Sequence, residues 1–225
     1  MKRTYKQMPL PYQVRLDRTQ KLYLGCKRAF DTLAAALLLT AAAPVMALVA
    51  LAIKLESPAE PVLFCQPRVG IGYRSFRLYK FRTMHAAAPR SCATSQLDDA
   101  HRYITPLGRI LRRASLDELP QLFNVLRGEM SLVGPRPLVW TEREMRLLRR
   151  WYGVYQVRPG ITGLAQVSGR DLLDNYEKLH LDREYLRRLG PAQDLHLACR
   201  TVRTVLSRAG YREGRAASPA PILEV

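Results

Sequence analysis

Residues 115–121, Ser-Leu-Asp-Glu-Leu-Pro-Gln, put two adjacent carboxylates directly before an apolar run. The apolar side chains recur at the spacing of one helix face: Leu119, Leu122, Phe123 and Leu126. This spacing predicts a helix that begins near Ser115, with Asp117 on the side opposite its buried face. Unpaired N–H groups at a helix start favour negative charge, so an ionised Asp117 is a candidate nucleophile toward phosphorus. The same pattern also permits a capping box between Ser115 and Glu118, which would make Glu118 purely structural.

The composition of the chain indicates an anionic partner. Its 225 residues, 48% of them hydrophobic, are enough for one globular core, and the formal charge is +17. Such a charge suits nucleic acid, anionic lipid or a phosphorylated substrate. No recognisable nucleic-acid-binding motif accompanies it and aromatic content is 8%, so no nucleic-acid partner is expected. The four cysteines lack metal-ligand spacing, and we expect a reduced, cytoplasmic setting.

An uncharged segment, residues 32–53, is long enough to enter a membrane. Pro44 lies near its middle, and Lys27, Arg28 and Lys54 flank it. A single span is the ordinary interpretation, but cations at both ends favour one cytoplasmic side for both flanks. We therefore predict a re-entrant helical hairpin that is bent at Pro44, with Thr40 helping to satisfy the broken turn.

The expected fold class is α/β, mostly helical with a small β element. We expect four parts: a basic extension without its own core (1–26), the re-entrant membrane helix (27–55), a cytoplasmic catalytic domain (56–206) and a disordered tail (207–225). Two strands are predicted within 61–66 and 76–84, followed by a loop over 85–99.

Two basic segments follow the acidic motif. In residues 141–155 the arginines Arg143, Arg146, Arg149 and Arg150 oppose an apolar side, which suits a membrane interface or a protein core. Residues 171–206 are expected to form one or two further basic amphipathic helices. Between the prolines of Gly-Pro-Arg-Pro, Arg136 is pre-organised to bind phosphate, although a surface turn is the commoner role of such an arginine. The glycine-rich run 158–170 is a weak signal for close backbone approach to a ligand.

Five of these motifs occur in a characteristic order: residues 66–70 (Gln-Pro-Arg-Val-Gly), 80–84 (Lys-Phe-Arg-Thr-Met), 115–122, 134–137 and 158–163 (Arg-Pro-Gly-Ile-Thr-Gly). With the apolar segment before them, they closely resemble the bacterial sugar transferases called monotopic polyprenyl-phosphate phosphoglycosyl transferases. The likeness covers about residues 27–206. It departs from the family at Ala43 before Pro44, at residues 57–61 and near residues 190–191, where the family's Trp-Ser is absent.

The resemblance implies transfer of sugar 1-phosphate from a UDP-sugar to polyprenyl (undecaprenyl) phosphate with release of UMP. This would be the first membrane step of surface polysaccharide or glycoconjugate assembly, on the cytoplasmic face of the bacterial inner membrane and in contact with its phospholipid. Asp117 would be the covalent nucleophile, and Asp117 and Glu118 would hold Mg²⁺. The substrate phosphates and nucleotide would bind to basic residues of the motifs: Arg112, Arg136, Arg158, Lys80, Arg82 and Arg68. Which UDP-sugar is used and whether the chain forms a homodimer stay open.

Non-enzymatic membrane scaffolding is the main rival, because basic amphipathic helices also bind anionic lipid. It would leave the carboxylate pair and Arg136 without a role.

Overall fold

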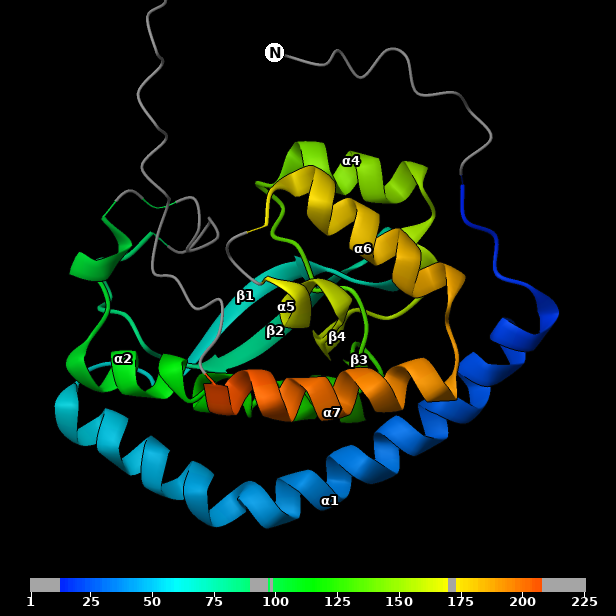
Figure 1. Cartoon of the computed structure of the whole chain (residues 1–225). Helices are drawn as coiled ribbons and strands as arrows, with labels where there is room; N and C mark the ends of the chain where they lie inside the picture. Colours follow the sequence, from blue (N-terminus) through cyan, green and yellow to red (C-terminus); the bar gives the residue numbers. More distant parts are fainter. Residues whose placement is uncertain (1–12, 90–96, 98, 170–172, 208–225) are drawn as a thin grey trace, which may run out of the picture.

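The computed structural model describes residues 13–89, 97, 99–169 and 173–207, and it has one long helix, α1 (Arg18–Glu56), below a body of shorter elements (Figure 1). The body contains, in chain order, β1 (Leu63–Val69), β2 (Ser75–Phe81), α2 (Pro106–Arg113), α3 (Gln121–Leu126), β3 (Ser131–Val133), α4 (Arg143–Trp151), β4 (Gly160–Thr162), α5 (Leu164–Ser168), α6 (Asn175–Arg187) and α7 (Pro191–Ser207). The prediction of a mostly helical α/β fold is confirmed. Residues 1–12 of the predicted extension, most of 90–98 and the tail from 208 lie outside the described residues.

Helix α1 begins earlier than the predicted boundary at residue 27. Asp17 accepts a hydrogen bond from the backbone N–H of Gln20 (2.7 Å), and the Gln20 side chain accepts one from the N–H of Asp17 (3.1 Å). This capping box fixes the helix start at Arg18. Just before it, Val14 and Leu16 are buried in a hydrophobic cluster of the body, so this end of the predicted extension packs against the rest of the molecule.

A re-entrant helical hairpin bent at Pro44 was predicted, and the structure has one helix that continues through that residue. The Thr40 hydroxyl does not repair a broken turn, because it donates to the carbonyl of Ala36 at 3.0 Å. Proline removes only one backbone donor, and packing on both sides of it can hold the remaining helix together. The result is an arc whose two ends turn toward the body (Figure 1).

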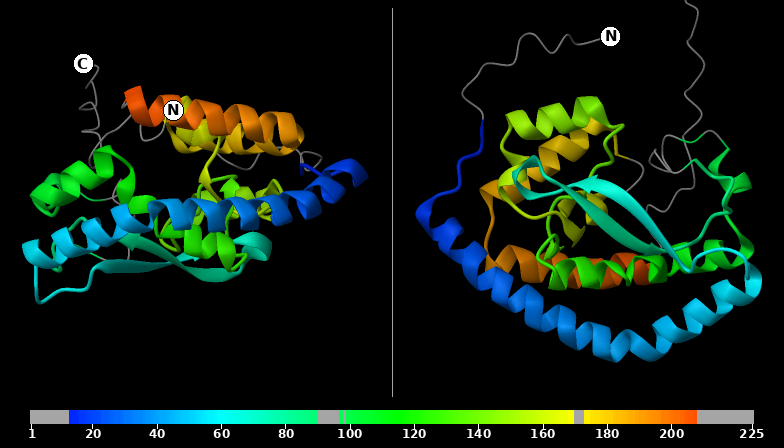
Figure 2. Two further views of the ribbon diagram at one scale, coloured as in Figure 1. Left: turned by 90° about the horizontal axis from the view of Figure 1, so that it is seen from below. Right: turned by 180° about the vertical axis from the view of Figure 1, so that it is seen from behind.

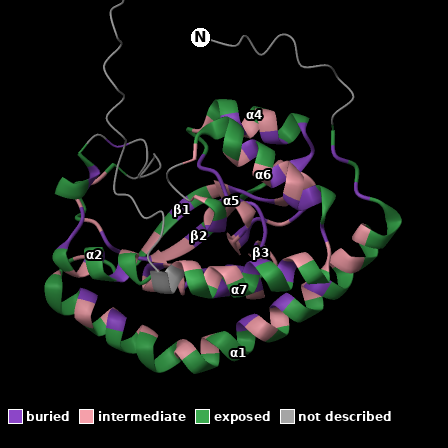
Figure 3. Cartoon of the chain, in the orientation of Figure 1, coloured by how far each residue is buried: buried purple, intermediate pink, exposed green. Residues whose placement is uncertain are grey.

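One face of α1 contacts the body on either side of Pro44. Ala35 is fully buried against Leu122 and its neighbours, and Ile53 lies in a second cluster with Phe81. Most of the opposite face is exposed (Figure 3). By length and composition, α1 is the one helix in the described part of the chain that could cross a membrane. Its exposed apolar face is typical of a surface that contacts lipid.

A buried polar cluster fixes the first half of α1. Lys27 Nζ lies 2.5 Å from Asp194 of α7, and Tyr185 of α6 donates to the same carboxylate at 2.9 Å. Ser131 of β3 donates to Asp31 at 2.6 Å. Since Lys27, Asp31 and Asp194 are all buried, these contacts specify how α1 meets β3, α6 and α7.

The two small sheets position the loops of the candidate site. β1 and β2 form an antiparallel hairpin in which Gln66 pairs with Leu78, confirming the two predicted strands. β3 and β4 are parallel, and they bring Gly134 against the glycine-rich run. A Cβ on Gly163 would lie 2.1 Å from the Gly134 carbonyl oxygen, and one on Gly160 would lie 2.1 Å from the Gly134 nitrogen. These glycines therefore allow two backbone segments to meet, where the sequence suggested close approach to a ligand.

Candidate active site

Asp117 lies in a tight turn between α2 and α3. Ser115 has a left-handed backbone (φ 56°) and makes no side-chain cap, so the capping box that was the alternative role for Glu118 does not form. Residues Leu116–Glu118 make a single 3-10 turn, and α3 begins only after Pro120. The predicted continuous helix from Ser115 is thus divided, and both carboxylates are freed from helix capping.

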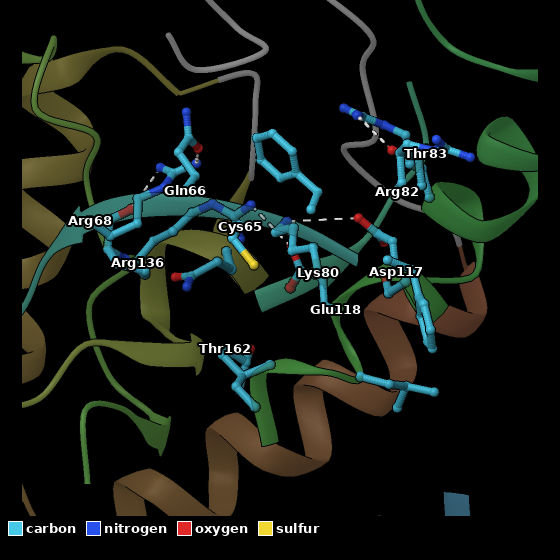
Figure 4. A pocket seen from close by; sticks show the side chains of 18 of the residues that line it. Cys65, Gln66, Arg68, Lys80, Arg82, Thr83, Asp117, Glu118, Arg136 and Thr162 are labelled. Carbon is cyan, nitrogen blue, oxygen red and sulfur yellow. Dashed lines mark hydrogen bonds and ion pairs between the residues drawn. The ribbon is translucent and has the colours of Figure 1, made fainter. Parts of the chain in front are cut away.

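Lys80 of β2 lies between the two carboxylates (Figure 4). Its Nζ is 2.6 Å from Glu118 Oε1 and 3.7 Å from Asp117 Oδ2. The guanidinium of Arg136 approaches the same Glu118 oxygen at 3.1 Å. Glu118 therefore carries most of the ion pairing, whereas Asp117, which is only 6% exposed, is held at a longer distance from its cation.

These surroundings shift the pKa values of the two carboxyl groups in opposite directions. Burial, with the neighbouring charge of Glu118, raises the pKa of Asp117, although Lys80 acts against this rise. Burial also acts to raise the pKa of Glu118, but Lys80 and Arg136 outweigh it and hold that pKa well below its usual range. Glu118 is therefore ionised at neutral pH, whereas the pKa of Asp117 lies above its usual value.

A cavity of about 730 Å³ surrounds this pair. Of the predicted binding residues it brings together Arg68, Lys80, Arg82, Arg112 and Arg136, together with Asp117 and Glu118. Arg158 does not line this cavity; its Nε donates to the Gly128 carbonyl at 2.8 Å instead. The predicted set is therefore gathered at one place, apart from Arg158, which supports the turn after α3.

The cations that line the cavity differ in how many contacts they already make with other protein groups. Arg82 forms an ion pair with Glu60. Arg68 donates to the Pro137 carbonyl at 3.1 Å and to Gln66 at 2.6 Å, and burial, with the nearby charge of Arg136, lowers its pKa to about 10. Arg68 still carries its charge at neutral pH, but it mainly supports the loop that holds Arg136.

Arg112 and Arg136 are better placed to meet a ligand. Arg136 is 47% exposed in its side chain. Arg112 makes one long contact, 3.5 Å, with the Thr83 hydroxyl. Figure 4 shows Arg136 and Arg68 on one side of Lys80 and Thr83 with Arg82 on the other. A bound diphosphate between them would have cations on both sides.

Residues of α4 and α6 hold the Arg136 loop in place through its backbone. Arg149 of α4 donates to the Arg136 carbonyl at 2.5 Å and pairs with Asp182 of α6 at 2.5 Å. Both side chains of this pair are at most 3% exposed. The sequence grouped Arg149 with the other arginines on the basic side of its helix; the structure buries it, because Asp182, distant in sequence, supplies a partner.

Sequence reasoning did not single out Gln166, which lines the cavity from α5. Both its amide nitrogen and its amide oxygen are buried without a hydrogen-bond partner among the described residues. Such a group is costly unless a ligand or water meets it. Its only signal in the sequence was its place inside the glycine-rich run.

Asp117 and Glu118 suit a magnesium ion that is also bound by substrate phosphates. Within the described ranges no cluster of three or more His, Cys, Asp or Glu side chains could hold a metal. Mg²⁺, however, is commonly bound by one or two carboxylates together with substrate phosphates. Asp117 and Glu118 fit that mode, because they adjoin each other in a cavity lined with phosphate-compatible cations.

Comparison with known proteins gives a consistent result. A family model described as bacterial sugar transferase matches residues 22–208. The undecaprenyl-phosphate glucose phosphotransferase of Komagataeibacter xylinus is 44% identical over 198 residues, covering 82% of this chain and 37% of that protein. The UDP-glucose:undecaprenyl-phosphate glucose-1-phosphate transferase of Caulobacter vibrioides is 45% identical over 190 residues, covering 80% of this chain and 70% of that protein. Exopolysaccharide production protein ExoY of Sinorhizobium fredii is 38% identical over 202 residues, covering 82% of this chain and 88% of that protein. The chain thus spans well under half of the first relative's length and most of the other two.

Proposed function

Because the chain belongs to the bacterial sugar transferase family, we propose that it transfers sugar 1-phosphate from a UDP-sugar to undecaprenyl phosphate and releases UMP. The observation that carries this proposal is the buried Asp117 beside Lys80, in a cavity lined by further arginines and next to an apolar helix. UDP-glucose is the first donor to test, since two of the relatives are named for glucose.

In the first half-reaction a carboxylate oxygen of Asp117 attacks the phosphorus that bears the sugar. A new P–O bond forms, and the bridging P–O bond breaks with its electron pair going to UMP. Lys80, Arg112 and Arg136 offset the charge of the diphosphate during this step. The product is a sugar phosphate held on Asp117 as an acyl phosphate.

In the second half-reaction a phosphate oxygen of undecaprenyl phosphate attacks the same phosphorus. The Asp117 carboxylate leaves, which gives undecaprenyl-diphospho-sugar and restores the free side chain. A covalent intermediate allows a water-soluble donor and a lipid acceptor to use one site in succession.

Mg²⁺ would be held by Asp117 and Glu118 with the donor diphosphate, where it supplies further neutralisation of phosphate charge. Lys80 and Arg136 keep Glu118 ionised, which supports this role. Chelation should abolish UMP release, and added Mg²⁺ should restore it.

For membrane placement, we infer that α1 enters the inner membrane from the cytoplasmic side and returns to it, so that the catalytic part stays with its UDP-sugar in the cytoplasm. The arc of α1 supports this inference, as do the cations on both sides of its uncharged segment: Lys27, Arg28 and Lys54.

The decisive experiment is to incubate the purified protein with UDP-glucose alone and then to add undecaprenyl phosphate. A stoichiometric burst of UMP and a sugar-phosphate adduct on Asp117, seen by mass spectrometry, are expected before the lipid is added. Asp117→Asn should show neither while still folding. UMP release only in the presence of lipid phosphate would favour direct displacement, and no release under any condition would favour a non-enzymatic membrane scaffold.

A further inference from the structure

The cavity around Asp117 has an apolar side that the first half-reaction does not use. Its apolar lining residues come from six neighbouring elements: Leu38 and Ala42 of α1, Leu119 before α3, Leu122 of α3, Leu132 of β3, Ile161 of β4, Ala165 of α5 and Ala198 of α7. Of the two proposed substrates, only the lipid acceptor carries a hydrocarbon chain, whereas the apolar surface of a UDP-sugar is limited to the faces of its uracil and sugar rings.

Two hydroxyl groups on this side are satisfied by protein partners, whereas the amide of Gln166 beside Ala165 has no hydrogen-bond partner among the described residues. Thr162 of β4 and Thr201 of α7 share a hydrogen bond of 2.7 Å between their hydroxyls, and Thr201 also donates to the Leu197 carbonyl at 2.7 Å. Paired hydroxyls can face hydrocarbon without loss of a hydrogen bond. The lining residues that α1 and α7 contribute carry no charge.

The helices that border this side also expose large apolar side chains, although His196 and Arg203 of α7 are exposed as well. On α1, Leu37 is 73% and Leu48 is 66% exposed; on α7, Leu195 is 67% and Val202 is 61% exposed. In the view from below, α7 runs roughly parallel to α1 and is separated from it (Figure 2, left). The apolar part of the cavity is therefore lined by two helices that also expose apolar side chains suited to lipid tails.

We propose that this part of the cavity, bounded by Leu38, Ala42, Ile161 and Ala198 and here called the tail channel, binds the isoprene units of the acceptor that lie next to its phosphate. This inference rests on the proposed function. The phosphate then reaches Asp117 among Lys80, Arg112 and Arg136, while the rest of the chain continues between α1 and α7 into the bilayer. One continuous cavity thus matches a ligand with a charged head and a hydrocarbon tail.

Filling the tail channel tests the proposal, because only the second half-reaction needs it. Ala42→Phe and Ala198→Phe each add a ring to the channel. Ala47→Phe on α1 and Ala192→Phe on α7 are matched controls, since both alanines are exposed and neither lines the cavity. UMP bursts with UDP-glucose alone, and then KM and kcat for undecaprenyl phosphate, are measured for all four variants in detergent.

The expected result is an unchanged UMP burst in every variant, with a KM for undecaprenyl phosphate at least tenfold higher in the two channel variants only. A short prenyl phosphate keeps the isoprene units next to the phosphate, so Ala42→Phe should use it less efficiently than the parent protein does. Parental KM in both channel variants would overturn the proposal, as would an equal rise in the controls. Loss of the burst in the channel variants alone would assign this wall to the donor and would equally overturn it. A parent protein that makes no UMP even with both substrates would refute the proposed function itself, which is a separate outcome.

Discussion

At the scale of single residues, the neighbours Asp117 and Glu118 should affect stability with opposite signs. The raised pKa of Asp117 means that its ionised form costs folding energy at pH values above its unfolded pKa. Asp117→Asn should therefore leave the free energy of unfolding equal or higher at pH 7. It should also abolish activity, because the proposed nucleophile is lost. Urea unfolding at pH 7 measures this, and a clearly destabilised Asp117→Asn would contradict the assigned direction of its pKa.

Glu118→Gln should do the reverse. The lowered pKa of Glu118 stabilises the fold above the unfolded pKa of about 4.3, and this stabilisation disappears as the pH falls through the folded value. Losing two charge-assisted contacts, to Lys80 and Arg136, should cost about 2 kcal/mol at pH 7. The gap between the parent and the variant should narrow in acid, and a gap that stays constant with pH would argue against an ionic role.

Lys80 should set the acid limit of the first half-reaction. Attack needs ionised Asp117, and Lys80 is the largest influence that lowers the pKa of Asp117 against burial. Lys80→Met should therefore slow the UMP burst and shift the acid limb of its pH profile to higher pH. Arg77→Met, an exposed cation on the opposite face of β2, is the control and should leave that limb in place.

At the scale of elements, the buried pair between α4 and α6 should act as a positioning device for Arg136. Arg149→Met removes the donor to the Arg136 carbonyl and leaves Asp182 as an unpaired buried charge, which should cost about 3–5 kcal/mol of stability. It should also raise the KM for UDP-glucose. Exposed Arg143→Met on the same helix should change neither quantity.

A second change separates stability from positioning. Adding Asp182→Leu to Arg149→Met removes both charges, so stability should largely return. The raised KM for UDP-glucose should persist, because the Arg136 carbonyl still lacks its donor. If KM recovers together with stability, the pair acts on folding alone.

The parts of these elements that the sequence predicted have local causes. The β1–β2 hairpin follows from short β-rich runs around a glycine turn, and Lys80 and Arg82 were identified from the motif that contains them. The burial of Arg149 depends on Asp182 in another helix, which no local pattern reveals. The left-handed Ser115 and the contacts of Gly134 with the glycine-rich run are likewise tertiary effects. Arg158 was assigned to the site because it belongs to one of the five family motifs, although its contact is a backbone carbonyl.

Helix α1 shows most clearly what the sequence pattern could not predict. Its inner face repeats at helical spacing through Lys27, Asp31, Ala35, Val49 and Ile53. Because the segment is apolar on nearly all sides, periodicity could not distinguish the inner face from the outer one. The proline was therefore given more weight than the packing that carries the helix past it.

At the scale of the whole molecule, the inferred re-entrant placement predicts that both ends of α1 lie in the cytoplasm. Lys21→Cys and Glu144→Cys are introduced separately after replacement of the native cysteines; both positions are exposed. An impermeant thiol reagent should label neither in intact cells and both after permeabilisation. Labelling of Lys21→Cys alone in intact cells would establish an ordinary span.

The two regions where α1 meets the body, around Ala35 and around Ile53, also fix how many residues can separate them. In an α-helix each added residue turns everything beyond it by about 100° and advances it by about 1.5 Å. One insertion near Ala41 would therefore rotate Ile53 away from Phe81 if Ala35 kept its place. Side chains on the outer face can vary with little effect on this packing, but the residue count between the two regions cannot. The number of residues between these two regions is thus constrained by helical phase, through the protein body.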